Sequence, residues 1–297
     1  MIAGLLLNAL FGIFQVNNII PYIIDPNPSV YWKQDIYGNR LDQVANGLFI
    51  TPNNLGSALI PPIVLLFSIF VYERNNIRTK VVLAPIFIVI AAGLFATYQK
   101  GGYIWAGVGM ILVLIPERIR LPASFLIFAA TTLAIIAYGR SLAVDPKDTL
   151  YMRTLLWEAA MQNISQNPSI LLLGNGMENM PYWGGVIARW VLKSSHNSWI
   201  DQILFYGVPG LLLYSALWVN ALVKSSIPVA RELPISRAIR IGLFAALFAL
   251  AGNAFFEPRS DGVFQIAQVF LIIAMIECQL QISKFRNDSR ALLAGVP

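Results

Sequence analysis

The chain has 297 residues, of which 57% are hydrophobic and 12% charged, and its mean hydropathy of +0.64 indicates a membrane protein and excludes an ordinary soluble globular domain. One cysteine, Cys278, and one histidine, His196, exclude a disulfide framework and a cysteine–histidine zinc cluster, so a metal site would have to consist of carboxylates. The net charge of +6 is spread over short segments between apolar runs, which is typical of membrane topology and argues against a nucleic-acid partner.

Eight apolar runs predict an all-α fold of about eight transmembrane helices. A helix needs about 20 apolar residues to cross roughly 30 Å of hydrocarbon. The runs are 2–24, 50–72, 81–98, 102–115, 121–139, 198–223, 241–256 and 263–281. The first run follows Met1 directly, with no basic region ahead of it and no small-residue cleavage site after it, so we expect a true span and not a signal peptide. We expect residues 1–297 to form a single transmembrane domain.

Lysine and arginine residues in the connecting segments predict the orientation. More than half of the chain's 21 such residues lie in four short segments, 73–80, 116–120, 224–240 and 283–290. These segments are predicted to face the cytoplasm, with both termini on the same side. The predicted external segments are 25–49, 99–101, 140–197 and 257–262, and the longest of them, 140–197, is expected to pack on the membrane face.

Within this external stretch, residues 150–164 are predicted to form an amphipathic helix that follows capping aspartates and ends at Asn167-Pro168. A helical wheel places an apolar stripe on one side, formed by Leu156, Trp157, Ala160, Met161 and Ile164. The opposite side is formed by Thr154, Glu158 and Gln162. Arg153 projects from the apolar stripe, where a guanidinium is costly unless an anionic group meets it. The alternatives, that Arg153 snorkels or stacks on Trp157, stay open.

The stretch KSSHNSWIDQILFYGVPG, residues 193–210, places His196 directly before an apolar helix. Ser198 and Asp201 match a capping box, which predicts a helix starting at Ser198, just after His196 and Asn197. A helix N-terminus favours anions and disfavours a protonated imidazole. His196 is therefore a candidate general base beside an anion site, and the alternative that it caps the helix or faces water stays open.

Three further cations lie in the external segments. Lys100 occupies a tight turn between two apolar runs, ahead of two glycines and several aromatic residues, where it either binds an anion or snorkels beside an aromatic belt. Arg189 and Lys193 belong to the amphipathic stretch GGVIARWVLK. They either contact phosphates of a substrate or of lipid headgroups, or anchor this stretch at the interface.

From about residue 40 to 255, the chain resembles the O-antigen ligase and polymerase superfamily. Five elements occur in the order of that family: NGLFITPNNLGSAL, YQKGGYIWAG, RTLLWEAA, LLLGNGMENM and SHNSWIDQILFYGVPGLLLY. The last element, a histidine-asparagine pair followed by glycine-x-x-glycine, is the most specific. Members of this family commonly carry more spans than this chain, and relative to them the first few are missing. The alternatives that the chain is a fragment, has a mis-assigned start or is a compact member stay open.

The resemblance implies a multi-pass enzyme of the bacterial inner membrane with an all-α fold and a periplasmic loop at 140–197. It would transfer a glycan from undecaprenyl diphosphate to an acceptor hydroxyl at the periplasmic face, with inversion and without a metal or other cofactor. His196 matches the residue that the family treats as catalytic, and Arg153 matches an essential arginine. Lys100 stands where the family usually has an arginine; it keeps the charge but loses the bidentate fork that fits a phosphate.

In the predicted mechanism, Arg153 and Lys100 hold the diphosphate and His196 takes the proton from the acceptor. Further substrate contacts are expected from Asn197, Arg189 and Lys193. The acceptor is the lipid A core for a ligase and another lipid-linked glycan for a polymerase, and the resemblance does not choose between them. A non-enzymatic transporter is a third alternative. Pro61-Pro62 and Pro209 are expected to break helices, but the notable charges lie at the external edge and not in mid-span.

Overall fold

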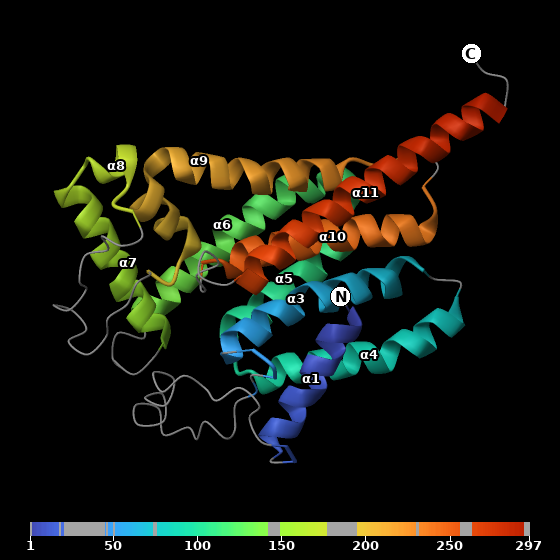
Figure 1. Ribbon diagram of the computed structural model, residues 1–297, viewed down its shortest axis with the longest axis horizontal. Helices are drawn as coiled ribbons and strands as arrows, with labels where there is room; N and C mark the ends of the chain where they lie inside the picture. Colours follow the sequence, from blue (N-terminus) through green and yellow to red (C-terminus); the bar gives the residue numbers. More distant parts are fainter. Residues whose placement is uncertain are drawn as a thin grey trace.

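The described part of the chain contains helices and no strands, which confirms the all-α class. A computed structural model describes residues 2–17, 19–20, 45, 47–49, 51–73, 76–141, 149–176, 195–229, 232–255 and 263–293. With the labels of Figure 1, the helices are α1 (Ile2–Val16), α3 (Pro52–Tyr72), α4 (Ile77–Ala96), α5 (Lys100–Leu114), α6 (Glu117–Ser141), α7 (Thr149–Gln166), α8 (Ile170–Leu173), α9 (Ser198–Ser226), α10 (Pro234–Asn253) and α11 (Val263–Leu293).

Each predicted span coincides with one helix, but only five described helices are long and apolar enough to cross a membrane. These are α3, α4, α6, α9 and α10. The apolar helices α1 and α5 are shorter, as is the apolar part of α11, residues 267–282. The 15 residues of α1 rise only about 22 Å, less than the hydrocarbon thickness of roughly 30 Å. Five of the eight predicted spans therefore have a helix that could cross a membrane, and all eight stay predictions.

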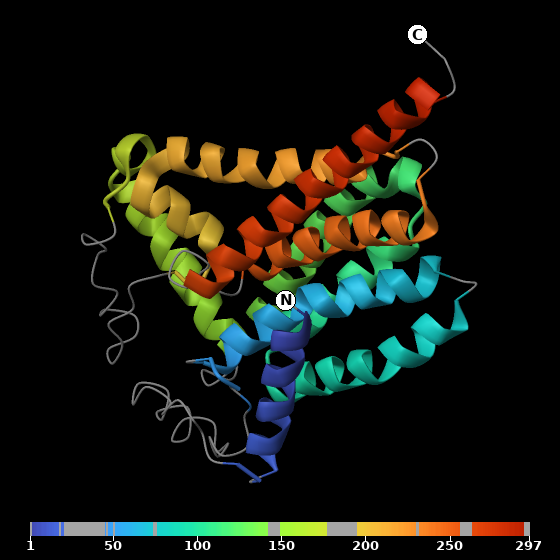
Figure 2. The same cartoon turned by 45° about the vertical axis from the view of Figure 1, so that its right-hand side comes forward.

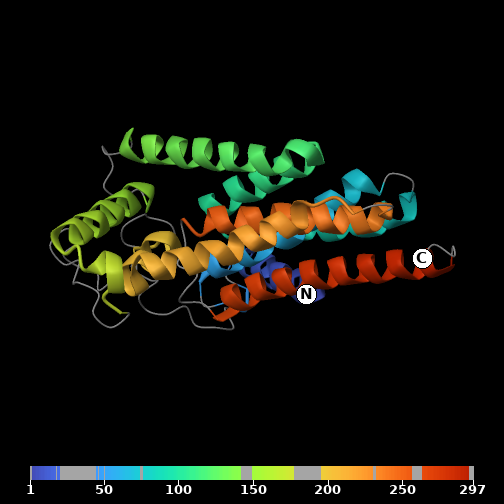
Figure 3. The ribbon, with the colours of Figure 1, turned by 90° about the horizontal axis from the view of Figure 1, so that it is seen from above.

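The long helices alternate in direction, so the bundle has two ends (Figures 1 and 2). At one end, which we call the His196 end, α3, α5, α9 and α11 begin and α4, α6 and α10 terminate. We call the opposite end the Arg240 end; the described residues of all four basic segments lie there. α7 and α8 lie beyond the His196 end, as the view from above also shows (Figure 3). The assignment of these ends to the two membrane faces stays a prediction.

Helices α3 and α10 form the centre of the bundle. Of the residues in their spanning windows, 72% and 78% are buried, against 6% in α6. Glycine allows them to approach closely, because a Cβ atom on Gly242 would lie 2.8 Å from Leu65 Cδ1 and 3.1 Å from Leu65 Cα. In the same way, Gly252 of α10 lies directly against the indole ring of Trp105 from α5.

The predicted helix break at Pro61-Pro62 is wrong, because α3 continues through both prolines. Proline removes the hydrogen bond to the carbonyl four residues earlier, so the Ser57 and Ala58 carbonyls lose their donors within the helix. Gln268 of α11 donates its Nε2–H to the Ala58 carbonyl at 2.8 Å, which replaces one of the two bonds. α9 is broken at Gly207, where φ is +68°, two residues before Pro209.

A buried ion-pair network holds the Arg240 end together. Arg240 is 2% exposed and donates from Nη2 to Glu232 at 2.8 Å and to Glu117 at 2.6 Å. Its Nη1 also donates to the Ser225 carbonyl at 3.2 Å. These bonds join α10 to the start of α6 and to the end of α9, so each buried charge has an opposite charge or a carbonyl dipole beside it.

Arg120 is the second buried cation at this end, with an exposure of 1%. It donates to the Leu112 and Ile115 carbonyls, at 3.0 and 2.7 Å, where the last turn of α5 leaves carbonyls without helical partners.

The segments 116–120 and 224–240 were expected to be connections between spans. That expectation is wrong in part, because α6 begins at Glu117 and α10 at Pro234, so Arg120 and Arg240 lie within helices.

We predict that Gly242→Ala destabilises the bundle. The added methyl group would overlap Leu65 and separate α3 from α10, at a cost of about 1–3 kcal/mol. Thermal unfolding of the purified protein in detergent, followed by tryptophan fluorescence, measures the effect as a lower Tm. Gly107→Ala in α5 is the matched control, since a Cβ atom there meets nothing within 4 Å. Equal Tm values for the two variants would contradict the central role of this contact.

Arg240→Met is predicted to cost about 3–5 kcal/mol, because it leaves Glu232 and Glu117 buried without their shared cation. Arg237→Met removes a cation that also pairs with Glu117 but is 49% exposed, and we expect a cost of at most about 1 kcal/mol. The same Tm measurement compares the two. A decrease in Tm for Arg237→Met as large as that for Arg240→Met would contradict the prediction.

Candidate functional site

The candidate site is built around the loop that precedes α9. As predicted, α9 begins at Ser198, directly after His196 and Asn197. The predicted capping residue is wrong, however: Asn197 and not Ser198 caps the helix. The Asn197 side chain is buried, and its Oδ1 accepts hydrogen bonds from the backbone N–H groups of Trp199 and Ile200, at 3.0 and 3.2 Å.

A second set of hydrogen bonds closes the loop across His196. Asp201 Oδ1 accepts from the Ser195 backbone N–H at 2.8 Å and from the Ser195 hydroxyl at 2.7 Å. Ser195 and Asp201 are both fully buried. His196 itself is partly exposed and has a φ of +55°, in the left-handed region that costs a non-glycine residue roughly 1–2 kcal/mol. The surrounding bonds therefore hold the imidazole-bearing residue in a conformation that it would not adopt alone.

The C-terminal turn of α10 supports this loop. The Ala254 carbonyl accepts a hydrogen bond from the Ser198 backbone N–H at 2.8 Å, and the Ala251 carbonyl accepts from Trp199 Nε1 at 3.2 Å. The rings of Trp199 and Phe255 lie 6.1 Å apart. The position of His196 is thus set by where α10 ends.

The same turn of α10 also reaches the segment that carries Lys100. Lys100 is exposed and is the first residue of α5, directly after Gln99. Gln99 Nε2 lies 3.1 Å from the Ser57 hydroxyl oxygen, and Asn253 Nδ2 lies 2.8 Å from the same oxygen. Ser57 therefore links the start of α5 to the end of α10.

Helix α7 carries Arg153. The pattern of buried and exposed residues along this helix agrees only in part with the helical wheel. Buried as predicted are Leu156, Trp157, Ala160 and Ile164, while Glu158 and Gln162 are exposed. Met161 is 54% exposed and Thr154 only 5%, so the wheel is wrong for both. The buried face is rotated toward Thr154, because α7 packs between α6 and the first turns of α9 and not on a flat surface.

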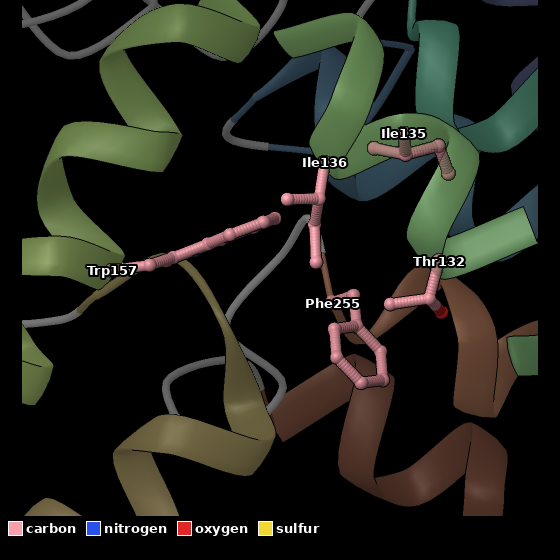
Figure 4. A pocket seen from close by; sticks show the side chains of 5 residues that line it. All are labelled: Thr132, Ile135, Ile136, Trp157 and Phe255. Atoms are coloured by element: carbon pink, nitrogen blue, oxygen red, sulfur yellow. The ribbon is translucent and has the colours of Figure 1, made fainter. Parts of the chain in front are cut away.

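Trp157 inserts into a narrow, mainly apolar pocket where α7 meets the bundle (Figure 4). The other lining residues are Thr132, Ile135 and Ile136 of α6 and Phe255, which follows α10. Arg153 is partly buried and precedes Trp157 by one helical turn, so the two side chains share a face of α7. Because Trp157 and Phe255 line the same pocket, this face of α7 lies near the residues that follow α10.

The segments that carry Lys100, Arg153 and His196 therefore all lie near the end of α10, at one end of the bundle: the first is linked to it through Ser57, the second shares a pocket with Phe255, and the third is hydrogen-bonded to it directly. Arg189 and Lys193, the two other predicted substrate-binding residues, lie outside the described residues. Among those that are described, no group of three or more histidine, cysteine, aspartate or glutamate residues could hold a metal ion. The arrangement combines two cations with one imidazole, a set that suits anion binding and proton transfer.

Sequence reasoning missed the residues that position this site, namely Ser57, Gln99, Ser195 and Asn253. A usable signal was present for some of them. Polar residues inside apolar runs, such as Ser57 and Asn253, are costly in a membrane unless they bond to one another or serve a function. The hydrogen bond between Ser57 and Asn253 joins residues that are 196 positions apart in sequence, so only the fold reveals it.

No protein-family model matches the chain, and no curated protein or solved structure shows significant similarity to it. The resemblance to the O-antigen ligase and polymerase superfamily therefore rests on the five sequence elements alone.

We predict that Asn197→Ala loosens the His196 loop, because the backbone N–H groups of Trp199 and Ile200 lose their acceptor. Loss of such a cap costs typically about 1 kcal/mol, equivalent to about fivefold faster local hydrogen exchange. Hydrogen–deuterium exchange of peptides covering residues 198–202 measures this directly. Asn76→Ala, which removes the equivalent cap of α4, is the control and should accelerate exchange only around Thr79. Unchanged exchange after residue 197 would exclude this role.

Proposed function

We propose that the chain is a membrane glycosyltransferase that moves a glycan from undecaprenyl diphosphate to an acceptor hydroxyl at the periplasmic face of the bacterial inner membrane. One observation carries the proposal: three segments far apart in sequence, bearing Lys100, Arg153 and His196, lie around the end of α10. The first is linked to it through Ser57, the second shares a pocket with Phe255, and the third is hydrogen-bonded to it directly. These are the residues that the family resemblance identifies as functional. The resemblance supplies the donor, and the common location supports a single site.

In the proposed reaction, Arg153 and Lys100 bind the diphosphate of the donor and stabilise the charge that develops as it leaves. The acceptor hydroxyl oxygen attacks the anomeric carbon while the bond between that carbon and the diphosphate oxygen breaks. The bonding electrons leave with undecaprenyl diphosphate. The hydroxyl proton passes to the neutral imidazole of His196, which later releases it to water. This single displacement inverts the configuration of the anomeric carbon.

The structure changes the role that we assign to Asn197. Its Oδ1 is occupied by two backbone N–H groups of α9, and the residue is 1% exposed. We therefore propose that Asn197 positions His196 and does not contact the substrate. Arg189 and Lys193 keep their proposed contacts with phosphates of the substrate or of lipid headgroups.

The transporter alternative receives less support from the described residues. Transporters commonly bind substrate at paired broken helices near the middle of the membrane. Here α3 is continuous through Pro61-Pro62, and Arg120 and Arg240 are paired near one end of the bundle. Ligase and polymerase share the proposed site and differ in the acceptor. Glycan chains that lengthen without attachment to the lipid A core would identify a polymerase.

His196→Gly is predicted to reduce transfer of a lipid-linked glycan by roughly 100- to 10,000-fold, the usual contribution of a general base. Glycine adopts a positive φ without strain, so this variant removes the imidazole and leaves the loop conformation intact. Added imidazole is expected to restore part of the activity. The assay uses purified protein with defined donor and acceptor, and His196→Ala is measured in parallel.

Glu158→Gln is the control for this experiment, because Glu158 is exposed on the face of α7 opposite to the buried stripe. It should transfer glycan at the rate of the unmodified protein. Undiminished transfer by His196→Gly, at an equal amount of folded protein, would exclude His196 as the general base and remove the basis of the proposal.

A further inference from the structure

We infer that Ser57, Gln99 and Asn253, together called the Ser57 cluster, are positioning residues that fix Lys100 relative to His196. Lys100 follows Gln99 directly, and the turn after Asn253 supports the His196 loop. The physical link is independent of any activity. Its effect on glycan transfer rests on the proposed function.

The cluster is buried and held together by hydrogen bonds between its side chains. Ser57 and Asn253 are fully buried and Gln99 is 5% exposed. The Ser57 hydroxyl oxygen lies 3.1 Å from Gln99 Nε2 and 2.8 Å from Asn253 Nδ2. Among the described residues, Gln99 Oε1 and Asn253 Oδ1 have no hydrogen-bond partner. Each carboxamide therefore depends on Ser57 for its side-chain hydrogen bond, and in a buried, apolar surrounding the loss of that bond is costly.

The surrounding backbone is arranged to hold these side chains. Two glycines make room for the Gln99 carboxamide: a Cβ atom on Gly102 would lie 2.7 Å from Gln99 Oε1, and one on Gly56 would overlap it. Pro61-Pro62 deprive the Ser57 and Ala58 carbonyls of helical donors one turn away. Gln268 of α11 bonds the Ala58 carbonyl. The polar groups of α3 thus concentrate where α5, α10 and α11 meet it.

A continuous path runs from this cluster to the imidazole. Asn253 is the last residue of α10, and the carbonyl of the next residue, Ala254, accepts the Ser198 N–H at 2.8 Å. Ser198 follows Asn197, which caps α9 and adjoins His196. Two hydrogen bonds at Ser57 and one at Ala254 therefore connect the start of α5 with the His196 loop. All groups in this path are uncharged, so it holds at any pH at which the protein is folded.

The test uses Ser57→Ala, with Ser68→Ala as a matched control. Both serines are fully buried on α3; Ser68 bonds the Ala238 carbonyl of α10 at 2.7 Å, toward the Arg240 end. Spin labels are attached to Lys100→Cys and Tyr206→Cys in a Cys278→Ser background, and their separation is measured by pulsed electron paramagnetic resonance. Lys100 and Tyr206 are exposed, and Tyr206 ends the first segment of α9.

We expect Ser57→Ala to broaden the distribution of distances between the labels, while Ser68→Ala leaves it as narrow as in the parent. In unlabelled protein, Ser57→Ala should lower kcat by roughly 100-fold, the effect of a displacement of about 1 Å, with little change in KM. If Ser57→Ala does not fold, Gln99→Ala is used. It breaks only the link to Lys100, and Gln99 makes no capping hydrogen bond to α5.

An unchanged distance distribution in Ser57→Ala or Gln99→Ala overturns the inference, whatever the activity. Equal broadening by Ser68→Ala also overturns it, because the effect would then be a general loosening of α3. If the distance distribution broadens in Ser57→Ala as expected but the parent transfers no glycan, the proposed function fails while the positioning role of the Ser57 cluster stands.

Discussion

The last turn of α10 is the constraint on which the geometry of the candidate site depends. Asn253 bonds Ser57 from the interior of the bundle, the Ala254 carbonyl accepts the first N–H of α9, and Phe255 lines a pocket together with Trp157 of α7. α10 is held along its length by close packing on α3. A turn at the end of a buried, well-packed helix is a rigid reference point, so three separate segments can be placed against it with little freedom.

The two ends of the bundle are stabilised by different interactions. At the Arg240 end, the buried guanidinium of Arg240 pairs with Glu117 and Glu232, while that of Arg120 donates to backbone carbonyls, and these bonds fix the charges in place. At the His196 end, hydrogen bonds of the neutral residues Ser57, Asn197 and Ser195 hold the helices and the loop together. The one charged partner among these bonds is the buried Asp201 carboxylate. This difference suits the proposed activity. A diphosphate attracted by Lys100 and Arg153 would compete with carboxylates for these cations, whereas it has little effect on bonds between neutral groups.

Local patterns predicted much of the helical structure. Eight apolar runs each correspond to a helix, α7 ends before Asn167-Pro168, and α9 starts after His196 and Asn197. Two errors arose because tertiary packing overrides local preference. The double proline is accommodated because Gln268 from another helix supplies a donor, and Thr154 is buried while Met161 is exposed because α7 packs between α6 and α9. Another error is local, since Asn197 and not Ser198 caps α9. Arg120 and Arg240 resembled loop charges because their partners are distant in sequence or belong to the backbone.

The sequence by itself determined the membrane character, the all-helical class and the identity of the candidate residues, because hydrophobic runs, helix signals and the single histidine are local properties of the chain. Only the tertiary structure decided that Lys100, Arg153 and His196 belong to segments that lie around the end of α10, and that Ser57 and Asn253 bond across 196 residues. The physical reason is that such meetings depend on how closely helices pack and at what angles. In this bundle, Gly242 and Gly252 set the packing distances, while the break at Gly207 redirects α9.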